Sequence, residues 1–360
     1  MSSLLDKVIR PEIRQLVRIN NTFDGRFDYL RLDKNECLEP FDEQLLDQFR
    51  INISSQDLSG YPELGPLYRK LSQFVGVAEN QIFLAAGSDI AIRSIFDACI
   101  EHHDNIVLHN PCYAMYKVYG QMFGAEVRSI PFYDWEADLE EMLSQVDSKT
   151  KIMAVENPNG YFGTKPSFEQ LEHSASELNR KDIILLIDDA YFYVENSQSK
   201  THELVENFPN VIITQTFSKS HGIAGLRMGY LIGSPKMIEQ ISRVRPMHEV
   251  TSLTAIGAEW VLDNPEILLR NQNLIKESKQ YLIDKLGKMG ILTKNTHANF
   301  ILLFFPNDGK TTGIIENLKE NQILMKSPFN TGVQKGWVRA TVGTLSDSKK
   351  LIKVIKRIIK

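Results

Sequence analysis

Residues 215–230 read Gln215-Thr-Phe-Ser-Lys-Ser-His-Gly-Ile-Ala-Gly-Leu-Arg-Met-Gly-Tyr230, which sets Lys219 among small residues with Arg227 eight positions later. A lysine amine that condenses with a carbonyl must lose its proton near neutral pH, which desolvation or a neighbouring cation achieves. The nearby serines and glycines leave room and donors for an anion, and an arginine grips a phosphate through two parallel hydrogen bonds. The stretch therefore indicates a site for a phosphorylated aldehyde. The alternative is a Gly/Ser turn that carries a solvated lysine.

Length and composition limit what this site belongs to. The 360 residues suffice for one large core and a smaller lobe, and a net charge of −4 gives no sign of a nucleic-acid surface. Three separated cysteines argue against a disulfide framework and fit a reducing compartment. The N-terminal residues lack the apolar core of a secretory signal, and no apolar run reaches membrane-spanning length. We expect a soluble, cytoplasmic protein that binds neither nucleic acid nor membrane.

Short apolar runs alternate with amphipathic stretches along the chain, a pattern typical of a mostly parallel α/β sheet with helices on both faces. The run Ile183–Ile187 is apolar at every position, as in a strand buried on both faces. Predicted strands are Asn105–His109, Lys151–Glu156, Ile183–Ile187 and Val211–Gln215. Predicted helices between them are Cys112–Phe123, Phe168–Leu178 and Pro235–Val244.

The last third of the chain predicts a small α+β unit behind a long charged helix, Pro265 to Met289. Its predicted elements are Asn299–Phe305, Thr311–Asn321, Trp337–Val342 and a basic terminal helix, Ser346–Lys360. A nucleic-acid or membrane patch on this terminal helix is disfavoured, because regular apolar positions predict packing beneath a solvated cationic face. We therefore expect an N-terminal arm (1–31), a large domain (32–264) and a small domain (265–360).

Polar residues follow several predicted strands, where the functional groups of α/β sheets gather. Asn157 follows one strand, and Asp188 and Asp189 follow the five apolar residues that end at Ile187, a costly position unless a cation lies nearby. Asn110–Tyr113 brings an aromatic ring to the same edge, and Ala85–Asp89 offers free N–H groups at a helix start. Each group also has a structural alternative, as a turn, a strand-end cap, a packing ring or an N-cap.

In this order, with Lys219, these groups resemble the fold-type I pyridoxal-phosphate enzymes, and within them aminotransferases similar to histidinol-phosphate aminotransferase. The resemblance covers nearly the whole chain, and its lysine block of Ser-Lys followed by Gly, Gly, Arg and Gly-Tyr is highly specific. Further motifs that carry it are Leu32-Asp-Lys-Asn-Glu36, Gly60-Tyr-Pro-Glu63 and Val338-Arg-Ala-Thr-Val-Gly-Thr344.

The resemblance implies that Lys219 forms the Schiff base with pyridoxal 5′-phosphate and later moves a proton between the substrate's Cα and the cofactor's C4′. Asp188 would keep the pyridine nitrogen protonated, which makes the ring an electron sink. Asn157 and Tyr191 would bind the ring's phenolic oxygen, and Tyr113 would stack on the ring.

The resemblance also implies a phosphate site and a homodimer with shared active sites, in which Tyr61 reaches the phosphate from the neighbouring subunit. The phosphate ligands would come from Gly87, Ser88, Asp89, Thr216, Ser218, Arg227 and Tyr61. Arg339 matches the arginine that receives the acidic group of the substrate. The expected substrate-binding set is Arg339, Asn35, Lys326 and Tyr161.

Departures from the family pattern concern the substrate more than the cofactor. The usual Asn-Pro-Asn-Asn-Pro-Thr-Gly is here Asn157-Pro-Asn-Gly-Tyr-Phe-Gly163, and Lys326 stands where the family tends to have an arginine. A lysine attracts an anion without the bidentate fork. We therefore expect an aminotransferase for a small amino or keto compound with an anionic tail, which includes phosphorylated compounds, and we do not expect histidinol phosphate to be the substrate.

Three alternatives carry less weight. One is decarboxylation of a phosphorylated amino acid, such as an O-phosphoserine-like or O-phosphothreonine-like compound, with the same cofactor. Another is a non-catalytic sensor, disfavoured because no DNA-binding helical domain precedes Leu32 and because Lys219 and Asp188 are both present. A metal at His102-His103-Asp104 is not expected, because adjacent histidines on a helix end point apart and no third ligand is spaced to help.

Overall fold

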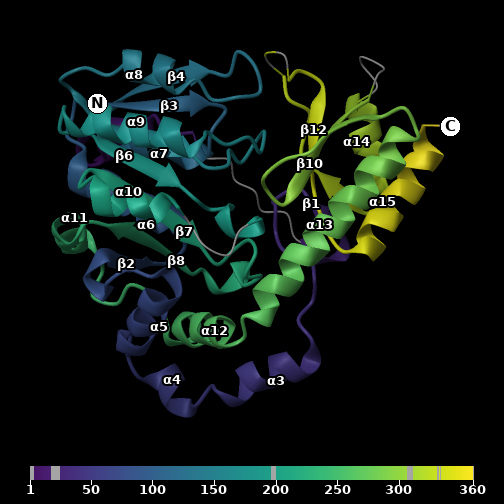
Figure 1. Ribbon diagram of the computed structural model, residues 1–360, viewed down its shortest axis with the longest axis horizontal. Coiled ribbons are helices and arrows are strands. Elements are labelled where there is room, and N and C mark those ends of the chain that lie inside the picture. Colours follow the sequence, from purple (N-terminus) through teal and green to yellow (C-terminus); the bar gives the residue numbers. More distant parts are fainter. Residues whose placement is uncertain are drawn as a thin grey trace.

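The computed structural model describes residues 4–17, 25–195, 200–305, 311–330, 332 and 334–359. A large α/β lobe lies on one side of the molecule and a smaller lobe on the other, with the long helix α13 (Glu266–Gly287) running from one to the other (Figure 1). Short helices of the N-terminal half lie beside the large lobe, and they are α1 (Leu4–Val8), α2 (Pro11–Arg14), α3 (Glu43–Ile51) and α4 (Ser55–Ser59).

A seven-stranded sheet forms the centre of the large lobe, with the strand order β2-β8-β7-β6-β5-β3-β4. The strands from β7 to β4 run parallel, whereas β8 pairs antiparallel with both β7 and β2. Their bounds are β2 (Ile82–Ala85), β3 (Asn105–Asn110), β4 (Glu126–Pro131), β5 (Thr150–Glu156), β6 (Ile184–Asp188), β7 (Val211–Thr216) and β8 (Gly229–Gly233).

Alternate residues of the central strands pack into two separate apolar layers. In β6, Leu185 and Ile187 belong to one layer, and Ile184 and Leu186 belong to the other. Helices over the first layer are α5 (Gly65–Val75), α8 (Leu139–Ser144), α9 (Phe168–Asn179), α10 (Thr201–Asn207) and α12 (Ser252–Asp263). Helices over the second layer are α6 (Ser88–Cys99), α7 (Ala114–Phe123) and α11 (Pro235–Ile241). Both faces are therefore covered, as the apolar run of β6 predicted.

The small lobe contains a three-stranded antiparallel sheet and a core of its own. Its strands are β9 (Leu292–Lys294), β10 (Phe300–Phe304) and β12 (Trp337–Thr341), packed with α13, α14 (Thr311–Glu320) and α15 (Leu345–Ile358). Strand β1 (Leu30–Leu32) comes from far earlier in the sequence and pairs in parallel with β11 (Ile323–Met325). Leu30 and Leu32 lie in the small-lobe core, so this early segment belongs to the small lobe although most of the chain that follows it forms the large one.

Most predicted elements are confirmed, with small shifts at their ends. Helix α7 begins two residues later than predicted, because Tyr113 has an extended backbone conformation. The helix predicted to end at Val244 ends at Ile241 and continues as a 3₁₀ turn. Lys360, at the end of the predicted terminal helix, lies outside the described residues.

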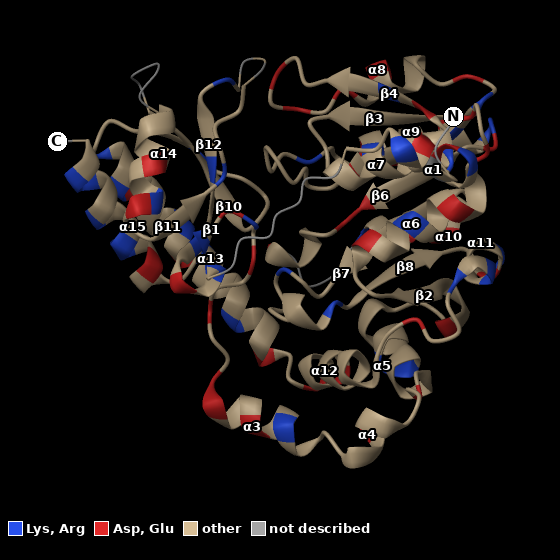
Figure 2. Cartoon of the chain, turned by 180° about the vertical axis from the view of Figure 1, so that it is seen from behind, with Lys and Arg blue, Asp and Glu red and all other residues tan. Residues whose placement is uncertain are grey.

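Charge is distributed unevenly on the surface, and α15 carries a row of lysines on its outer side (Figure 2). Its apolar side chains, such as Leu351 and Ile355, lie in the small-lobe core. The predicted division of this helix into a packed and a solvated face is therefore confirmed. Among the described helices, none is long and apolar enough to cross a membrane.

Candidate active site

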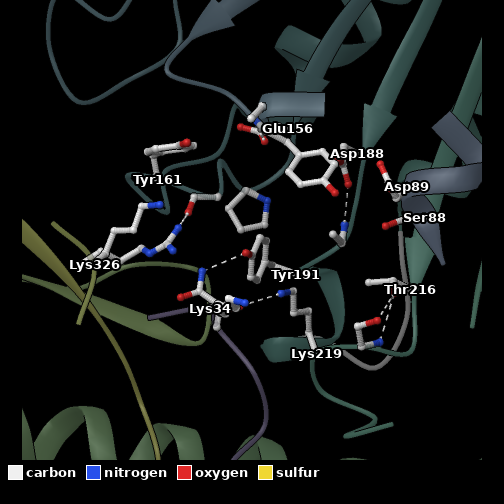
Figure 3. Close-up of a pocket in the computed structure, with 18 of the residues that line it drawn as sticks. Lys34, Ser88, Asp89, Glu156, Tyr161, Asp188, Tyr191, Thr216, Lys219 and Lys326 are labelled. Atoms are coloured by element: carbon white, nitrogen blue, oxygen red, sulfur yellow. Dashed lines mark hydrogen bonds between the residues drawn. The ribbon is translucent and has the colours of Figure 1, made fainter. Parts of the chain in front are cut away.

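A cavity of about 380 Å³ opens where the carboxyl ends of β5, β6 and β7 face the small lobe (Figure 3). In a mostly parallel sheet this edge is the usual place for a ligand. The lining residues are Asp33, Lys34, Asn35, Ser88, Asp89, Tyr113, Ala114, Glu156, Pro158, Gly160, Tyr161, Asp188, Ala190, Tyr191, Thr216, Ser218, Lys219, Arg227, Lys326 and Arg339.

Lys219 reaches this cavity from the turn that follows β7. Its Nζ donates a hydrogen bond of 3.3 Å to the backbone carbonyl of Lys34 and lies 5.2 Å from the centre of the Tyr191 ring. Its hydrogen-bond partner is a backbone oxygen, and among the described residues no carboxylate forms an ion pair with it, so the amine can approach a carbonyl ligand without breaking a salt bridge.

Asp188 ends β6 as a buried carboxylate at the cavity. Its Oδ2 accepts a 2.9 Å hydrogen bond from the Tyr116 hydroxyl, and its Oδ1 accepts one of 3.1 Å from the Ala190 N–H. Burial raises the pKa of Asp188 to about 6, although both hydrogen bonds favour the charged form. A cationic ligand group beside Asp188 would offset this desolvation, so the position suits a protonated ring nitrogen.

Asp189 turns to the other side of the sheet, away from the cavity. It accepts hydrogen bonds from Thr201 Oγ1 at 2.7 Å and from Asn157 Nδ2 at 2.8 Å. Burial raises its pKa to about 7. Of the two adjacent aspartates, only Asp188 faces the proposed ligand.

A tight cradle lies at the start of α6. A Cβ at Gly87 would lie 2.5 Å from Arg227 Nη2, and a Cβ at Gly229 would lie 2.2 Å from Ser88 N, so neither position has room for a side chain. The Ser218 hydroxyl accepts hydrogen bonds from Thr216 Oγ1 at 3.0 Å and from Arg227 Nη1 at 3.5 Å. Free N–H groups at a helix start, two hydroxyls and a guanidinium make an anion site that fits a phosphate.

Tyr191 lies between Lys219 and the small lobe, with its hydroxyl at the cavity. Its oxygen accepts a 2.9 Å hydrogen bond from Asn35 Nδ2, while Asn35 Oδ1 accepts one of 3.0 Å from Thr341 Oγ1. The Asn35 N–H also donates to Thr341 Oγ1 at 2.9 Å. Because its oxygen accepts from Asn35, the Tyr191 O–H remains available as a donor to a ligand oxygen.

Cationic side chains from distant parts of the chain meet at one wall of the cavity. Arg339 of β12 donates through Nη1 to the Gly160 carbonyl and through Nη2, at 2.8 Å, to the Asp33 carbonyl. Lys34 and Lys326 line the cavity beside it. Burial lowers the pKa of Lys326, and the charges of Arg339 and Lys34 lower it further.

The cavity brings together thirteen of the sixteen predicted site residues. They are Asn35, Ser88, Asp89, Tyr113, Tyr161, Asp188, Tyr191, Thr216, Ser218, Lys219, Arg227, Lys326 and Arg339. Gly87 lies directly behind the wall, in contact with Arg227.

Two predicted residues lie elsewhere in this chain. Asn157 is buried but is not part of the cavity lining, because its carboxamide faces Asp189 on the other side of the sheet. Its contact with the ring oxygen stays a prediction. Tyr61 is 83% exposed and stacks on His248 with ring centres 4.4 Å apart. Within one chain, Tyr61 does not reach the phosphate cradle.

Sequence reasoning did not single out Glu156, Tyr116 or Lys34. Glu156 is the last residue of β5, and burial together with the charge of Asp188 raises its pKa to about 8. The signal that revealed Asp188, a carboxylate at the end of a buried strand, was equally present at Glu156. Tyr116 had no comparable signal, because its spacing resembles that of ordinary core residues of α7.

The fold and this site define a class of protein. A mostly parallel sheet that presents a lysine, a buried aspartate and a phosphate cradle at one edge is that of a fold-type I pyridoxal-phosphate enzyme. The chain belongs to the aminotransferase class I and II family, whose family model matches residues 28–358. It is a pyridoxal-phosphate-dependent aminotransferase similar to histidinol-phosphate aminotransferases.

Individual relatives agree with this assignment. The histidinol-phosphate aminotransferase of Christiangramia forsetii is 32% identical, with 98% of each chain covered. The solved histidinol-phosphate aminotransferase of Sinorhizobium meliloti, in complex with pyridoxal-5′-phosphate, shares the fold with a TM-score of 0.86, 20% identity and 97% of each chain covered. L-threonine-O-3-phosphate decarboxylase of Porphyromonas gingivalis has a TM-score of 0.77 at 19% identity, with 92% of this chain and 99% of that one covered.

Proposed function

We propose that this aminotransferase acts on a small amino compound, and on its keto counterpart, that carries a second acidic group, a carboxylate or a phosphate. The observation that carries the proposal is the convergence of Lys34, Lys326 and Arg339 on one wall of the cavity. These cations repel one another, which is why the pKa of Lys326 is lowered by its two neighbours as well as by burial. An anionic group bound between them relieves that repulsion.

The cofactor supplies an electron sink that stabilises negative charge at the substrate's Cα. Lys219 Nζ would hold the cofactor's aldehyde group, and the same amine would move the proton at the substrate's Cα. Asp188 would hold the ring nitrogen in its protonated form, from a buried position in which a charge pair is strengthened. The Tyr191 O–H would donate to the ring's phenolic oxygen, and Tyr113 would cover one face of the ring.

The phosphate of the cofactor lies, in this proposal, at the start of α6. Ser88 and Asp89 offer N–H groups, Thr216 and Ser218 offer hydroxyls, and Arg227 offers its guanidinium, whereas Gly87, whose N–H donates to the Ala85 carbonyl, leaves room for the phosphate. Arg339 receives the substrate's carboxylate, and Lys326 with Lys34 receives the second acidic group. Asn35 and Tyr161 complete the wall on that side.

We also propose a homodimer in which Tyr61 of one subunit completes the phosphate site of the other, because Tyr61 is exposed and remote from its own cavity. Residues 32–264 would form the large domain and residues 265–360 the small one, preceded by an arm (1–31) that ends in strand β1. A cytoplasmic location fits the three described cysteines, all of which are free.

A half-reaction screen tests the substrate proposal. Holoenzyme is mixed with phosphorylated, dicarboxylic and plain amino acids, and conversion of the bound cofactor to its amine form is followed by absorbance. Compounds with a second acidic group should react at concentrations about tenfold lower than plain ones. Lys326→Ala should remove most of this preference, whereas Lys353→Ala on the outer face of α15 should not.

Two results would contradict the proposal. Equal reactivity of plain and doubly acidic compounds would remove the role of the cationic wall. Release of carbon dioxide without formation of the cofactor's amine form would favour decarboxylation of a phosphorylated amino acid. Lys219→Ala serves as the reference variant, and it should lose both turnover and the absorbance of the lysine-bound cofactor.

A further inference from the structure

Glu156 is a carboxylate at the active-site edge of the sheet that the roles above leave unused. It is the residue of β5 that pairs in register with Asp188 of β6, and it lines the cavity. Figure 3 shows it on the side of the cavity opposite Lys219, near Asp188 and Tyr161. Two neighbouring carboxyl groups in a buried place are costly, so the second one needs an explanation.

The hydrogen bonds of Glu156 go to the protein and not into the cavity. Its Oε1 accepts a 2.7 Å bond from the Tyr113 N–H, and the nearby Gly160 backbone acts to lower the pKa of the carboxyl. Its Oε2 accepts from the side-chain amide of Asn159. With one N–H donor on each oxygen, the carboxylate joins the segment before α7 to the loop that follows β5.

Gly160 connects this carboxylate to the substrate-binding arginine. It directly follows Asn159, whose amide Glu156 holds, a Cβ on it would lie 3.8 Å from Glu156 Oε1, and its carbonyl accepts from Arg339 Nη1. Arg339 is only 8% exposed, its Nη2 is held by the Asp33 carbonyl, and its Nε has no hydrogen-bond partner among the described residues. A shift of Gly160 therefore removes one of the two backbone contacts that hold the guanidinium.

We infer that Glu156 is a positioning residue for Arg339, acting through Gly160 to set how tightly the enzyme holds the carboxylate of its substrate. The inference rests on the proposed role of Arg339. Glu156 itself touches neither substrate nor cofactor, since its oxygens are occupied by donors from the protein. The N–H donors and Arg339 favour the charged form of Glu156, against burial and Asp188, which raise its pKa to about 8.

The test uses Glu156→Gln holoenzyme above pH 8, where the wild-type carboxyl is ionised. The amide keeps the size of the side chain but presents an NH₂ group to donors that need an acceptor. The probes are L-alanine and ethylamine, which is the same amine without the carboxylate, and binding is followed by the absorbance of the lysine-bound cofactor. The half-saturating concentration of L-alanine should rise about tenfold, and that of ethylamine should change less than twofold.

A double-variant comparison separates a link through Arg339 from a general structural defect. In an Arg339→Gln background, Glu156→Gln should add no further loss of L-alanine binding. Glu156→Asp should recover part of the loss, and the exposed Glu239→Gln should behave as wild type. Equal loss for both amines, or a full additional loss in the Arg339→Gln background, would overturn the inference.

A second measurement needs neither substrate nor turnover. Phenylglyoxal modifies accessible arginines, and peptide mass spectrometry follows its reaction at Arg339, with the exposed Arg50 as the internal reference. Glu156→Gln should speed modification of Arg339 several-fold and leave Arg50 unchanged. An unchanged rate at Arg339 would refute the inference even if the proposed function holds. Conversely, faster modification in an enzyme that shows no preference for acidic substrates would refute the proposed function alone.

Discussion

The close contact between β8 and the start of α6 allows a sharp test of the phosphate cradle, through Gly229→Ala. A Cβ at this position would lie 2.2 Å from the backbone nitrogen of Ser88 and 2.4 Å from the carbonyl carbon of Gly87. Ordinary contact begins near 3.4 Å. Because backbone atoms cannot rotate away as a flexible side chain does, the loop before α6 must move by about 1 Å.

This shift displaces the N–H groups from which the cofactor's phosphate would accept hydrogen bonds. Hydrogen bonds to charged groups contribute about 1.5–3 kcal/mol each, and about 1.4 kcal/mol corresponds to a tenfold change in affinity. Loss of one such bond therefore predicts about 10- to 100-fold weaker binding of pyridoxal phosphate. The overpacking itself should lower the free energy of unfolding by about 1–3 kcal/mol.

The assay is titration of cofactor-free protein with pyridoxal phosphate and with pyridoxal, which lacks the phosphate. Gly229→Ala should weaken binding of the first compound far more than binding of the second. Gly225→Ala is the matched control, since a Cβ at Gly225 would meet nothing within 4 Å. If Gly229→Ala binds pyridoxal phosphate as tightly as Gly225→Ala does, the cradle is not the phosphate site.

Three further predictions follow from the site and its surroundings. Asn157→Ala should lower the free energy of unfolding by about 1–3 kcal/mol, because buried Asp189 loses a hydrogen-bond donor. The same variant should leave the absorbance maximum of the bound cofactor unchanged, whereas Tyr191→Phe should shift that maximum. Burial lowers the pKa of His221 to about 3. Below about pH 6.5 the unfolded chain therefore binds a proton at this side chain that the folded chain does not bind, and the free energy of unfolding falls as the pH drops. In urea unfolding, the free energy of unfolding of His221→Phe should fall less steeply than that of wild type, by about 1.4 kcal/mol per pH unit between pH 6 and 4. Parallel plots of this free energy against pH for the two proteins would contradict the reasoning. Mixing inactive Lys219→Ala and Tyr61→Ala proteins should restore activity if subunits share sites, and no recovery after subunit exchange would argue against the shared site.

Local patterns in the sequence determined the sheet and the centre of the site. The apolar run Ile183–Ile187 marks a doubly buried strand, because only such a strand needs apolar residues on both faces. Asp188 was conspicuous for the same reason, as a charge directly after that run. Lys219 and Arg227 were found because they lie eight residues apart in one stretch of the chain.

Tertiary structure decided which side chains face the ligand. Side chains alternate between the two faces along a strand, and of Glu156, which ends β5, and Asn157, which directly follows it, only Glu156 lines the cavity. The apolar residues before them are buried on both faces, so no alternation in the sequence tells which face holds the site. The structure selects Glu156 and directs Asn157 to Asp189.

Contacts between residues far apart in the sequence also could not be predicted from local sequence patterns. Asn35 and Thr341 bond each other across 306 positions of sequence, and Lys34, Lys326 and Arg339 meet only because β1 pairs with β11 beside β12. The sequence by itself determined the cofactor chemistry, since its groups sit at strand ends with recognisable neighbours. Only the folded chain determined the wall that receives the substrate, because that wall is assembled from segments that no sequence spacing relates.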